Sequence, residues 1–251
     1  MLEIKNLFAG YGSSEVLHGA TARFERGRLT AVIGKNGSGK STLIKATLGI
    51  LKIKSGEITV DGDDLLTLKR AEIARRIAYL PQGGGIPDMT VGELVISGRF
   101  PYLSYPRRYT ERDREIALRS MESLGISHLA DTPLQRLSGG MRRTAHIAMA
   151  LAEETDYILL DEPTAFLDIA HQIELVKMLK KLAETGRGAV AVMHDLPLAF
   201  TFADEIAVMD SGRVILQGEP REILDTGAVK ELLGVSLAII ENGSYAYSYD
   251  K

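Results

Sequence analysis

The fold of this chain is decided by the stretch Leu29-Thr-Ala-Val-Ile33-Gly34-Lys-Asn-Gly-Ser-Gly39-Lys40-Ser41. It opens with a short apolar run that is typical of a buried strand. The remainder matches the pattern G-x-x-x-x-G-K-[ST], in which glycines let several backbone N–H groups point at one anion. We expect a helix from Ser41 to Leu48, which would present its positive N-terminus to the same anion. The stretch therefore predicts a strand, a phosphate-binding loop and a helix, in that order.

Lys40 and Ser41 supply the polar side chains of this loop. The lysine ammonium would reach the β- and γ-phosphates of a nucleotide, and the serine hydroxyl would ligate Mg²⁺. A plain glycine-rich turn is the alternative. The fixed positions of the pattern would recur by chance in only about one chain of this length in a hundred. We therefore interpret the loop as an ATP site.

Two further apolar runs, Tyr157–Leu160 and Ala189–Met193, are typical of buried strands, and each ends at a polar or charged cluster. Between them, residues Ile169 to Thr185 have helical spacing and stop at Gly186. Strand, helix and strand in that order, with continuously apolar strands, indicate a mostly parallel sheet that is covered on both faces. We therefore expect an α/β fold with a P-loop NTPase core.

Three short segments near the N-terminus have a different pattern. Polar and apolar residues alternate at Leu2–Lys5, and polar positions are interleaved at Thr21–Phe24 and Glu57–Val60. Such strands have one solvated face and one buried face. They predict a smaller antiparallel β subdomain beside the parallel sheet.

The middle of the chain is helical in pattern. Thr110 would cap a helix that carries an apolar stripe, and prolines and the Gly83–Gly85 run mark turns around this region. We expect one ATPase domain in which residues 1–85 and 146–251 form the nucleotide-binding core. Residues 86–145 would form an inserted helical subdomain.

Composition narrows the classes of protein. The chain has 251 residues, 45% of them hydrophobic, a formal net charge of -3 and no cysteine. It is long enough for a large α/β domain, it cannot hold a disulfide or thiolate site, and its charge does not predict a nucleic-acid partner. No apolar run approaches the roughly 20 residues that span a bilayer, and we expect no signal peptide. We expect a soluble chain whose membrane role, if any, comes through a partner.

Polar residues follow the predicted strands where ligands bind in open α/β sheets. Asp161 would hold Mg²⁺ through its water shell, and Glu162 would polarise the attacking water. His194 would contact the γ-phosphate, and Gln82 would touch Mg²⁺ or the water. Tyr11 would stack on a flat base. The alternatives are a solvated strand end for the carboxylates, a structural histidine, a loop glutamine without a role and a half-buried turn tyrosine.

A second glycine pair, in Leu137-Ser138-Gly139-Gly140, precedes a predicted helix at Met141–Leu151. Ser138 would cap the helix, and the glycines would expose backbone N–H groups. A helix cap alone explains the serine and one glycine, but it does not require two. We interpret the segment as a second anion site in the same chain.

Together these motifs resemble the ATP-binding subunit of ABC transporters over essentially the whole chain. Gly34–Ser41 looks like Walker A, Gln82 like the Q-loop, Leu137–Gly140 like the signature, and Asp161 and Glu162 like Walker B and the catalytic base. Leu167-Asp168 looks like the D-loop. The resemblance implies a head-to-tail dimer of two copies, in which each signature covers the ATP held by the partner. Opening and closing of that dimer would drive a membrane partner.

Three stretches, Gly98–Tyr102, Leu167–Gln172 and His194–Leu196, are similar to the importers of iron-siderophores, haem and vitamin B12. The resemblance implies polytopic permease subunits as partners and, indirectly, an extracytoplasmic substrate-binding protein. It implies a cytoplasmic location, peripheral on the inner face of the membrane. Zinc and manganese importers share some of these stretches, and other chains would choose the cargo.

Two departures from the family pattern stand near the site. Met141 occupies a signature position that usually carries Gln or Glu, and Ala165 with Phe166 replaces the usual Ser or Thr before the D-loop. We expect altered rates and not an inactive subunit. The other hypotheses are a soluble ABC ATPase, for example in cluster assembly, and a non-catalytic nucleotide-gated module, which would lack the base at Glu162.

The motifs and the resemblance together give the full set of predicted site residues. We expect ATP to contact Tyr11, Gly34, Asn36, Gly37, Ser38, Gly39, Lys40, Ser41 and Thr42, with Ser138, Gly139 and Gly140 acting across the dimer; Mg²⁺ to bind Ser41, Gln82 and Asp161; and Glu162, His194 and Gln82 to act in catalysis.

Overall fold

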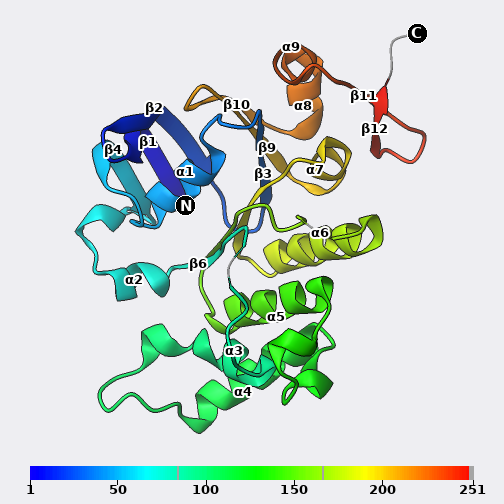
Figure 1. Ribbon diagram of the computed structural model, residues 1–251. Helices are drawn as coiled ribbons and strands as arrows, with labels where there is room; N and C mark the ends of the chain where they lie inside the picture. Colours follow the sequence, from blue (N-terminus) through cyan, green and yellow to red (C-terminus); the bar gives the residue numbers. More distant parts are fainter. Residues whose placement is uncertain (84, 166, 249–251) are drawn as a thin grey trace.

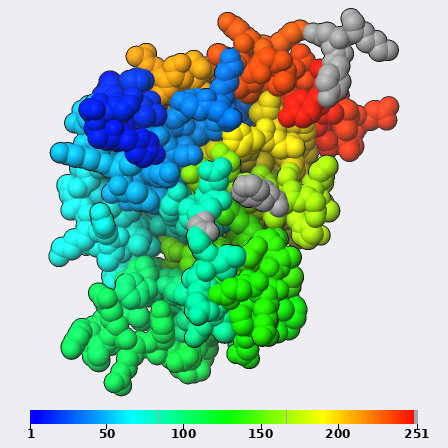
Figure 2. Space-filling view, in the orientation of Figure 1, coloured from blue at the N-terminus to red at the C-terminus, as the bar shows by residue number. Residues whose placement is uncertain are grey.

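The computed structural model describes residues 1–83, 85–165 and 167–248. Gly84, inside the predicted Gly83–Gly85 turn, and Phe166 lie outside the described residues. Figure 1 shows an α/β molecule with the N-terminal sheet at one corner, a central sheet, and a separate group of helices at the opposite end. Figure 2 shows the same division on the surface, where the green helical segment projects below the rest. The predicted fold class is confirmed.

The central sheet is mostly parallel, as predicted. Neighbouring strands are parallel except for β9 and β10, which pair antiparallel at one edge. The predicted run Tyr157–Leu160 is a strand with all its residues buried, which a sheet covered on both faces requires. In sheet order the strands are β10 (Arg213–Gly218), β9 (Glu205–Asp210), β3 (Leu29–Gly34), β8 (Gly188–Val192), β7 (Tyr157–Leu160) and β6 (Ile77–Leu80).

The antiparallel sheet near the N-terminus is also present, with longer strands than the sequence pattern predicts. Its order is β2 (Ser14–Phe24), β1 (Leu2–Tyr11), β4 (Ile53–Val60) and β5 (Asp63–Asp64). The β1 strand passes through Asn6 at a φ of 48°, and its register against β2 shifts between Ile4 and Leu7. Such a bulge inserts an extra residue and breaks the period of two. The alternation therefore stops at Lys5 although the strand continues.

Two hydrophobic cores lie on opposite faces of β3. Leu29, Ala31 and Ile33 belong to one core, while Val32 belongs to the other, because successive strand residues point to opposite faces. The first core contains α5 (Gly139–Ala152), α6 (Ile169–Glu184) and α7 (Leu196–Phe202). The second holds α1 (Lys40–Thr47) between the two sheets. This sandwich fixes α1, and with it the phosphate loop, in space.

The helical end of the molecule has a third core. It is built from α3 (Val91–Ser97), α4 (Glu111–Ser123), η3 (Ser127–Leu129), η4 (Leu134–Arg136) and part of α5. The short helix η2 (Phe100–Tyr102) connects α3 to the segment before α4. The Thr110 hydroxyl caps α4 in a capping box with Asp113. Helix α5 belongs to two cores, since Ala148 packs in the helical one and Ile147 against the central sheet. The predicted boundary at 145/146 falls within this shared helix, and the division into subdomains stays a prediction.

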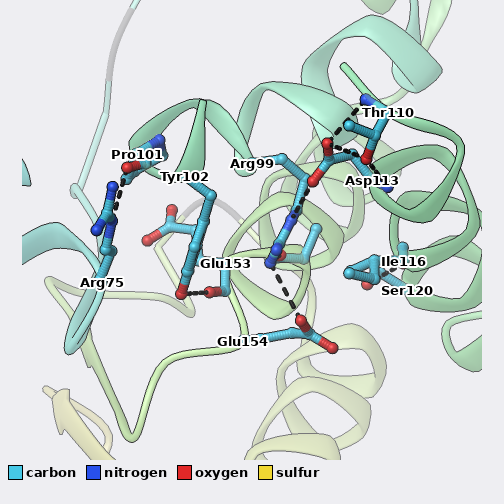
Figure 3. A network of polar contacts seen from close by, with 11 residues as sticks. Arg75, Arg99, Pro101, Tyr102, Thr110, Asp113, Ile116, Ser120, Glu153 and Glu154 are labelled. Carbon is cyan, nitrogen blue, oxygen red and sulfur yellow. Dashed lines mark hydrogen bonds and ion pairs between the residues drawn. The ribbon is translucent and has the colours of Figure 1, made fainter. Parts of the chain in front are cut away.

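The Gly98–Tyr102 stretch ties this helical end together (Figure 3). The buried Arg99 guanidinium donates to Asp113 Oδ1 at 3.1 Å and to the Ala152 carbonyl at 2.8 Å. It also lies 4.0 Å from the centre of the Tyr102 ring. A Cβ at Gly98 would lie 2.4 Å from the Met149 carbonyl oxygen, so a side chain does not fit. This motif therefore locks α3 and η2 against α4 and the end of α5.

The remaining elements pack beside the antiparallel and the central sheet. Among the described residues, no helix is both long and apolar enough to span a membrane. The C-terminal hairpin packs on α7, where the Phe200 and Tyr245 rings are 5.4 Å apart. The elements not yet named are η1 (Leu65–Thr67), α2 (Arg70–Ala74), α8 (Pro220–Asp225), α9 (Ala228–Leu233), and the hairpin strands β11 (Ser236–Ile239) and β12 (Tyr245–Ser248).

Candidate nucleotide site

The phosphate loop follows β3 and opens α1, as the sequence predicts. Gly34 has a φ of 153°, and a Cβ there would lie 2.3 Å from the Met209 carbonyl oxygen and 2.7 Å from Ser38 Oγ. Gly39 has a φ of 102° directly before the helix. Residues other than glycine rarely adopt such backbone angles. The glycines are thus required by close packing under the loop and by its curvature.

A cleft of about 720 Å³ opens beside this loop. It gathers side chains from β1, the loop, α1 and the ends of three parallel strands. Tyr11 stands at its edge and is 48% exposed, so its ring is available for stacking. The cleft is lined by Tyr11, Val16, Asn36, Gly37, Gly39, Lys40, Ser41, Thr42, Gln82, Glu162 and His194.

Val16 is the only residue of that lining that the sequence pattern did not suggest. It is an ordinary strand residue of β2, and nothing in its neighbourhood sets it apart from other β-branched positions. Within the phosphate loop, two predicted contacts, Gly34 and Ser38, lie outside the lining. Ser38 is buried, and its hydroxyl has no hydrogen-bond partner among the described residues.

Lys40 is held inside the loop. Its ammonium donates to the carbonyl oxygens of Gly34 at 2.8 Å and Lys35 at 2.9 Å. Burial lowers the pKa of Lys40, while the nearby carboxylates of Glu162 and Asp161 act in the opposite direction. An ammonium that already faces carbonyl oxygens can exchange them for phosphate oxygens, which form stronger charge-assisted bonds.

The two carboxylates that follow β7 reach different partners. The Ser41 hydroxyl donates to Asp161 Oδ1 at 2.7 Å, and Asp161 is 2% exposed. A hydroxyl and a carboxylate side by side are the oxygen ligands that Mg²⁺ takes, together with waters and substrate phosphates. The described residues hold no cluster of three or more His, Cys, Asp and Glu side chains that could bind a metal alone. The donor set therefore fits a magnesium ion shared with a nucleotide.

Both carboxylate oxygens of Glu162 have a side-chain partner. His194 Nε2 lies 2.7 Å from Glu162 Oε1, and the Gln82 amide donates to Glu162 Oε2. The backbone of Glu162 has a φ of 47°, in the left-handed region that non-glycine residues visit sparsely. Residues held in this region cluster at functional sites. Three side chains predicted separately are thus brought to one point.

The Ser138–Gly140 segment lies away from this cleft. The Ser138 hydroxyl accepts from the Met141 backbone N–H at 3.2 Å, which makes it the cap of α5. A Cβ at Gly140 would lie 3.5 Å from the His171 ring and 3.7 Å from the Leu167 side chain. None of these three predicted nucleotide contacts belongs to the lining that surrounds Lys40. One chain alone does not bring the two predicted anion sites together.

Arg143 is a residue of the site that the sequence pattern missed. Its guanidinium donates to the carbonyl oxygens of Pro81 at 2.8 Å and Pro163 at 3.0 Å, directly beside Gln82 and Glu162. Burial lowers the pKa of Arg143 to about 10. Helical spacing could have pointed to Arg143, because it lies on the same face of α5 as Ile147 and Ala150, which are buried against the central sheet.

Comparisons with known proteins agree with this geometry. The family model described as ABC transporter matches residues 17–165. The ferric enterobactin transport ATP-binding protein FepC of Escherichia coli (strain K12) is 39% identical over 240 residues, covering 95% of this chain and 89% of FepC. The petrobactin import ATP-binding protein FpuD of Bacillus anthracis is 38% identical over 240 residues, covering 95% and 88%.

A solved structure, a nucleotide-free ATP-binding cassette from an ABC transporter, superposes with a TM-score of 0.83 at 27% identity. The match covers 93% of this chain and 97% of that one. The order of the motifs, the cleft beside the phosphate loop and these relatives lead to one conclusion. The chain belongs to the ABC transporter family, as an ATP-binding subunit that hydrolyses ATP.

Proposed function

We propose that this chain is the motor subunit of a membrane importer for iron-siderophore complexes or related metal chelates. The observation that carries the proposal is the convergence of Ser41 with Asp161, and of Gln82 and His194 with Glu162, beside the phosphate loop. The relatives named for ferric enterobactin and petrobactin transport support the class of cargo. They cover nearly the full length of the chain.

In this proposal the cleft binds ATP with its phosphates on the loop and its base on Tyr11. Lys40 gives up the two loop carbonyls for phosphate oxygens, and the N–H groups from Asn36 to Thr42 complete the cradle. Mg²⁺, when bound, neutralises charge on the transferred phosphoryl group. Ser41, Asp161 and Gln82 would hold it.

Glu162 acts as the base for the attacking water. His194 and Gln82 orient its carboxylate, one on each oxygen. His194 lines the same cleft, and its ring would contact the γ-phosphate during the attack. The side chains of the cleft therefore have three separate roles, which are phosphate binding, metal binding and activation of the attacking water.

We propose a second copy of the chain as the partner that completes the site. The amides of Ser138, Gly139 and Gly140 open α5 away from the chain's own cleft. In a head-to-tail dimer they would cover the nucleotide of the other copy. Such a dimer would attach at the cytoplasmic face of the membrane to permease subunits and, through them, act with an extracytoplasmic binding protein. The helical segment 86–145 would be the part that moves against the core at 1–85 and 146–251.

The test of the base is the variant Glu162→Gln, with the isosteric and exposed Glu184→Gln as its control. We expect turnover to fall by about 10²- to 10⁴-fold in the first. ATP should still bind, and an ATP-dependent dimer should accumulate by size-exclusion chromatography. Normal turnover of Glu162→Gln would refute the assignment.

The test of the biological role is the membrane protein that co-purifies with the chain. A polytopic permease pair whose vesicles accumulate ferric siderophore supports the proposal. Zinc or manganese uptake instead would move the chain to the metal-ion importers. Recovery of soluble assembly factors alone would favour a cluster-assembly ATPase and end the transport proposal.

A further inference from the structure

Arg143 joins the helix that carries the signature segment to the strand ends that carry the hydrolytic side chains. It lies three residues after Gly140 on α5. Its guanidinium reaches four backbone carbonyls on two other segments. The shorter contacts are to Pro81 at 2.8 Å and Pro163 at 3.0 Å. Longer contacts run to Glu162 at 3.4 Å and Asp161 at 3.5 Å.

These carbonyls are the frame of the catalytic groups. Pro81 immediately precedes Gln82, and the other three belong to the turn that begins at Asp161. Carbonyl oxygens only accept hydrogen bonds, while a guanidinium presents five donors in one plane. One side chain can therefore clamp the ends of β6 and β7 at a fixed separation, which a single ammonium cannot do in the same geometry.

The clamp also bears on the backbone of Glu162. That residue has a φ of 47° without being glycine. Sparsely populated backbone angles persist only where the surroundings over-determine them. The Glu162 carbonyl faces the Arg143 guanidinium, and the Glu162 carboxylate faces His194 and Gln82. Arg143 is thus one of two contacts that hold this residue from the backbone side; the other is the Ala165 N–H, which donates to the same carbonyl at 3.2 Å.

We propose that Arg143 is a positioning residue for ATP hydrolysis, which couples the placement of the Ser138–Gly140 segment to the geometry of Gln82, Asp161 and Glu162. The inference rests on the roles proposed above for those three side chains. Docking of the signature segment on a partner's nucleotide would move α5, and the clamp passes that movement to the strand ends. Arg143 does not touch the nucleotide cleft, so its loss acts on turnover and leaves nucleotide binding in place.

The test compares Arg143→Met and Arg143→Lys in the full chain. Methionine keeps an apolar stem and removes every donor, while lysine keeps the charge but not the planar fork. Arg119→Met is the matched control, because Arg119 is exposed on α4 and has no side-chain hydrogen bond or ion pair within the described residues. The measurements are kcat and KM for ATP, the Kd of a fluorescent ATP analogue, and the folded fraction by circular dichroism.

We expect the kcat of Arg143→Met to fall about 10- to 100-fold, the range that a misplaced catalytic group produces. The Kd of Arg143→Met for the ATP analogue should stay within about threefold of the parent value. The kcat of Arg143→Lys should lie between the kcat of the parent and that of Arg143→Met. A kcat within about twofold of the parent, or a loss of kcat matched by the loss of folded protein, would overturn the inference. A parallel rise of Kd would overturn it too, since it would place Arg143 in nucleotide binding.

If Arg143→Met does not fold, the kcat and Kd of Arg143→Lys are compared with the parent values to test the inference by the same criteria. Glu162→Gln is measured in the same assay. Parent turnover of Glu162→Gln would refute the proposed base. Parent turnover of Arg143→Met beside an inactive Glu162→Gln would refute the clamp alone.

Discussion

Glu153 is a half-buried acid whose replacement has a consequence that can be estimated as a free energy. It follows α5 and lines a hollow of about 340 Å³ whose other members are mostly apolar, among them Ile73, Phe100 and Met149. Burial raises the pKa of Glu153 to about 8. Its carboxylate has no hydrogen bond or ion pair within the described residues; the contact drawn at Glu153 in Figure 3 is its backbone carbonyl, which accepts from the Tyr102 hydroxyl.

The sign of the pH effect follows from proton binding. Between the ordinary value of 4.5 and about 8, the folded chain keeps Glu153 protonated while the unfolded chain releases the proton. The free energy of unfolding therefore falls as pH rises through this window, with a slope of up to about 1.4 kcal/mol per pH unit from this group. Below the window the group costs nothing, and above about pH 8 the loss is complete.

The full shift sets an upper limit of about 5 kcal/mol, at about 1.4 kcal/mol for each pKa unit. The hollow is open to water on one side, and screening reduces this, so we expect about 1–3 kcal/mol. The replacement Glu153→Gln removes the titration but keeps the shape. The variant should match the parent near pH 5 and exceed it in stability by that amount near pH 9.

The assay is urea unfolding of parent and Glu153→Gln at a series of pH values across this window. The quantity that decides is the difference in free energy of unfolding between the two proteins, plotted against pH. Glu184→Gln, an exposed acid at the end of α6, is the control and should give a flat difference. A flat line for Glu153→Gln, or one that falls with pH, would refute the reasoning.

Three further predictions follow from close contacts. Lys40→Met should weaken ATP binding about 10- to 100-fold by fluorescence titration, because charge-assisted bonds to the phosphates are lost. Gly98→Ala should lower the free energy of unfolding by about 1–3 kcal/mol, since its Cβ would lie 2.4 Å from the Met149 carbonyl oxygen. Arg99→Met should lower it by about 3–5 kcal/mol, because Asp113 is left buried without its cation.

Each of these has a matched control in an open position. Lys52→Met removes an exposed lysine beyond the C-terminal end of α1, Gly85→Ala adds a methyl group where nothing lies within 4 Å, and Arg119→Met removes an exposed arginine. Unchanged ATP affinity in Lys40→Met would show that the ammonium does not reach the phosphates. Stability of Gly98→Ala or Arg99→Met equal to its control would contradict the packing and the buried ion pair.

Sequence patterns predicted best where the structure is local. The run Tyr157–Leu160 has its predicted bounds, and α6 ends within one residue of its prediction. The predicted strands in β1 and β2 are present but were predicted too short, because register shifts between them and the positive φ of Asn6 in β1 break the alternation. The second half of a strand that pairs on both sides is held by its neighbours in the sheet, and these are distant in sequence.

By itself, the sequence determined the phosphate loop, because the left-handed angle of Gly39 and the contacts of Lys40 with Gly34 and Lys35 lie within the loop itself. Only the tertiary structure decided what meets that loop. Ser41 and Asp161 are 120 residues apart, and they touch because β3 and β7 lie on either side of β8 in one sheet. The clamp at Arg143 was equally hidden, since its partners are carbonyl oxygens, which every residue type carries and which only the packing of α5 selects.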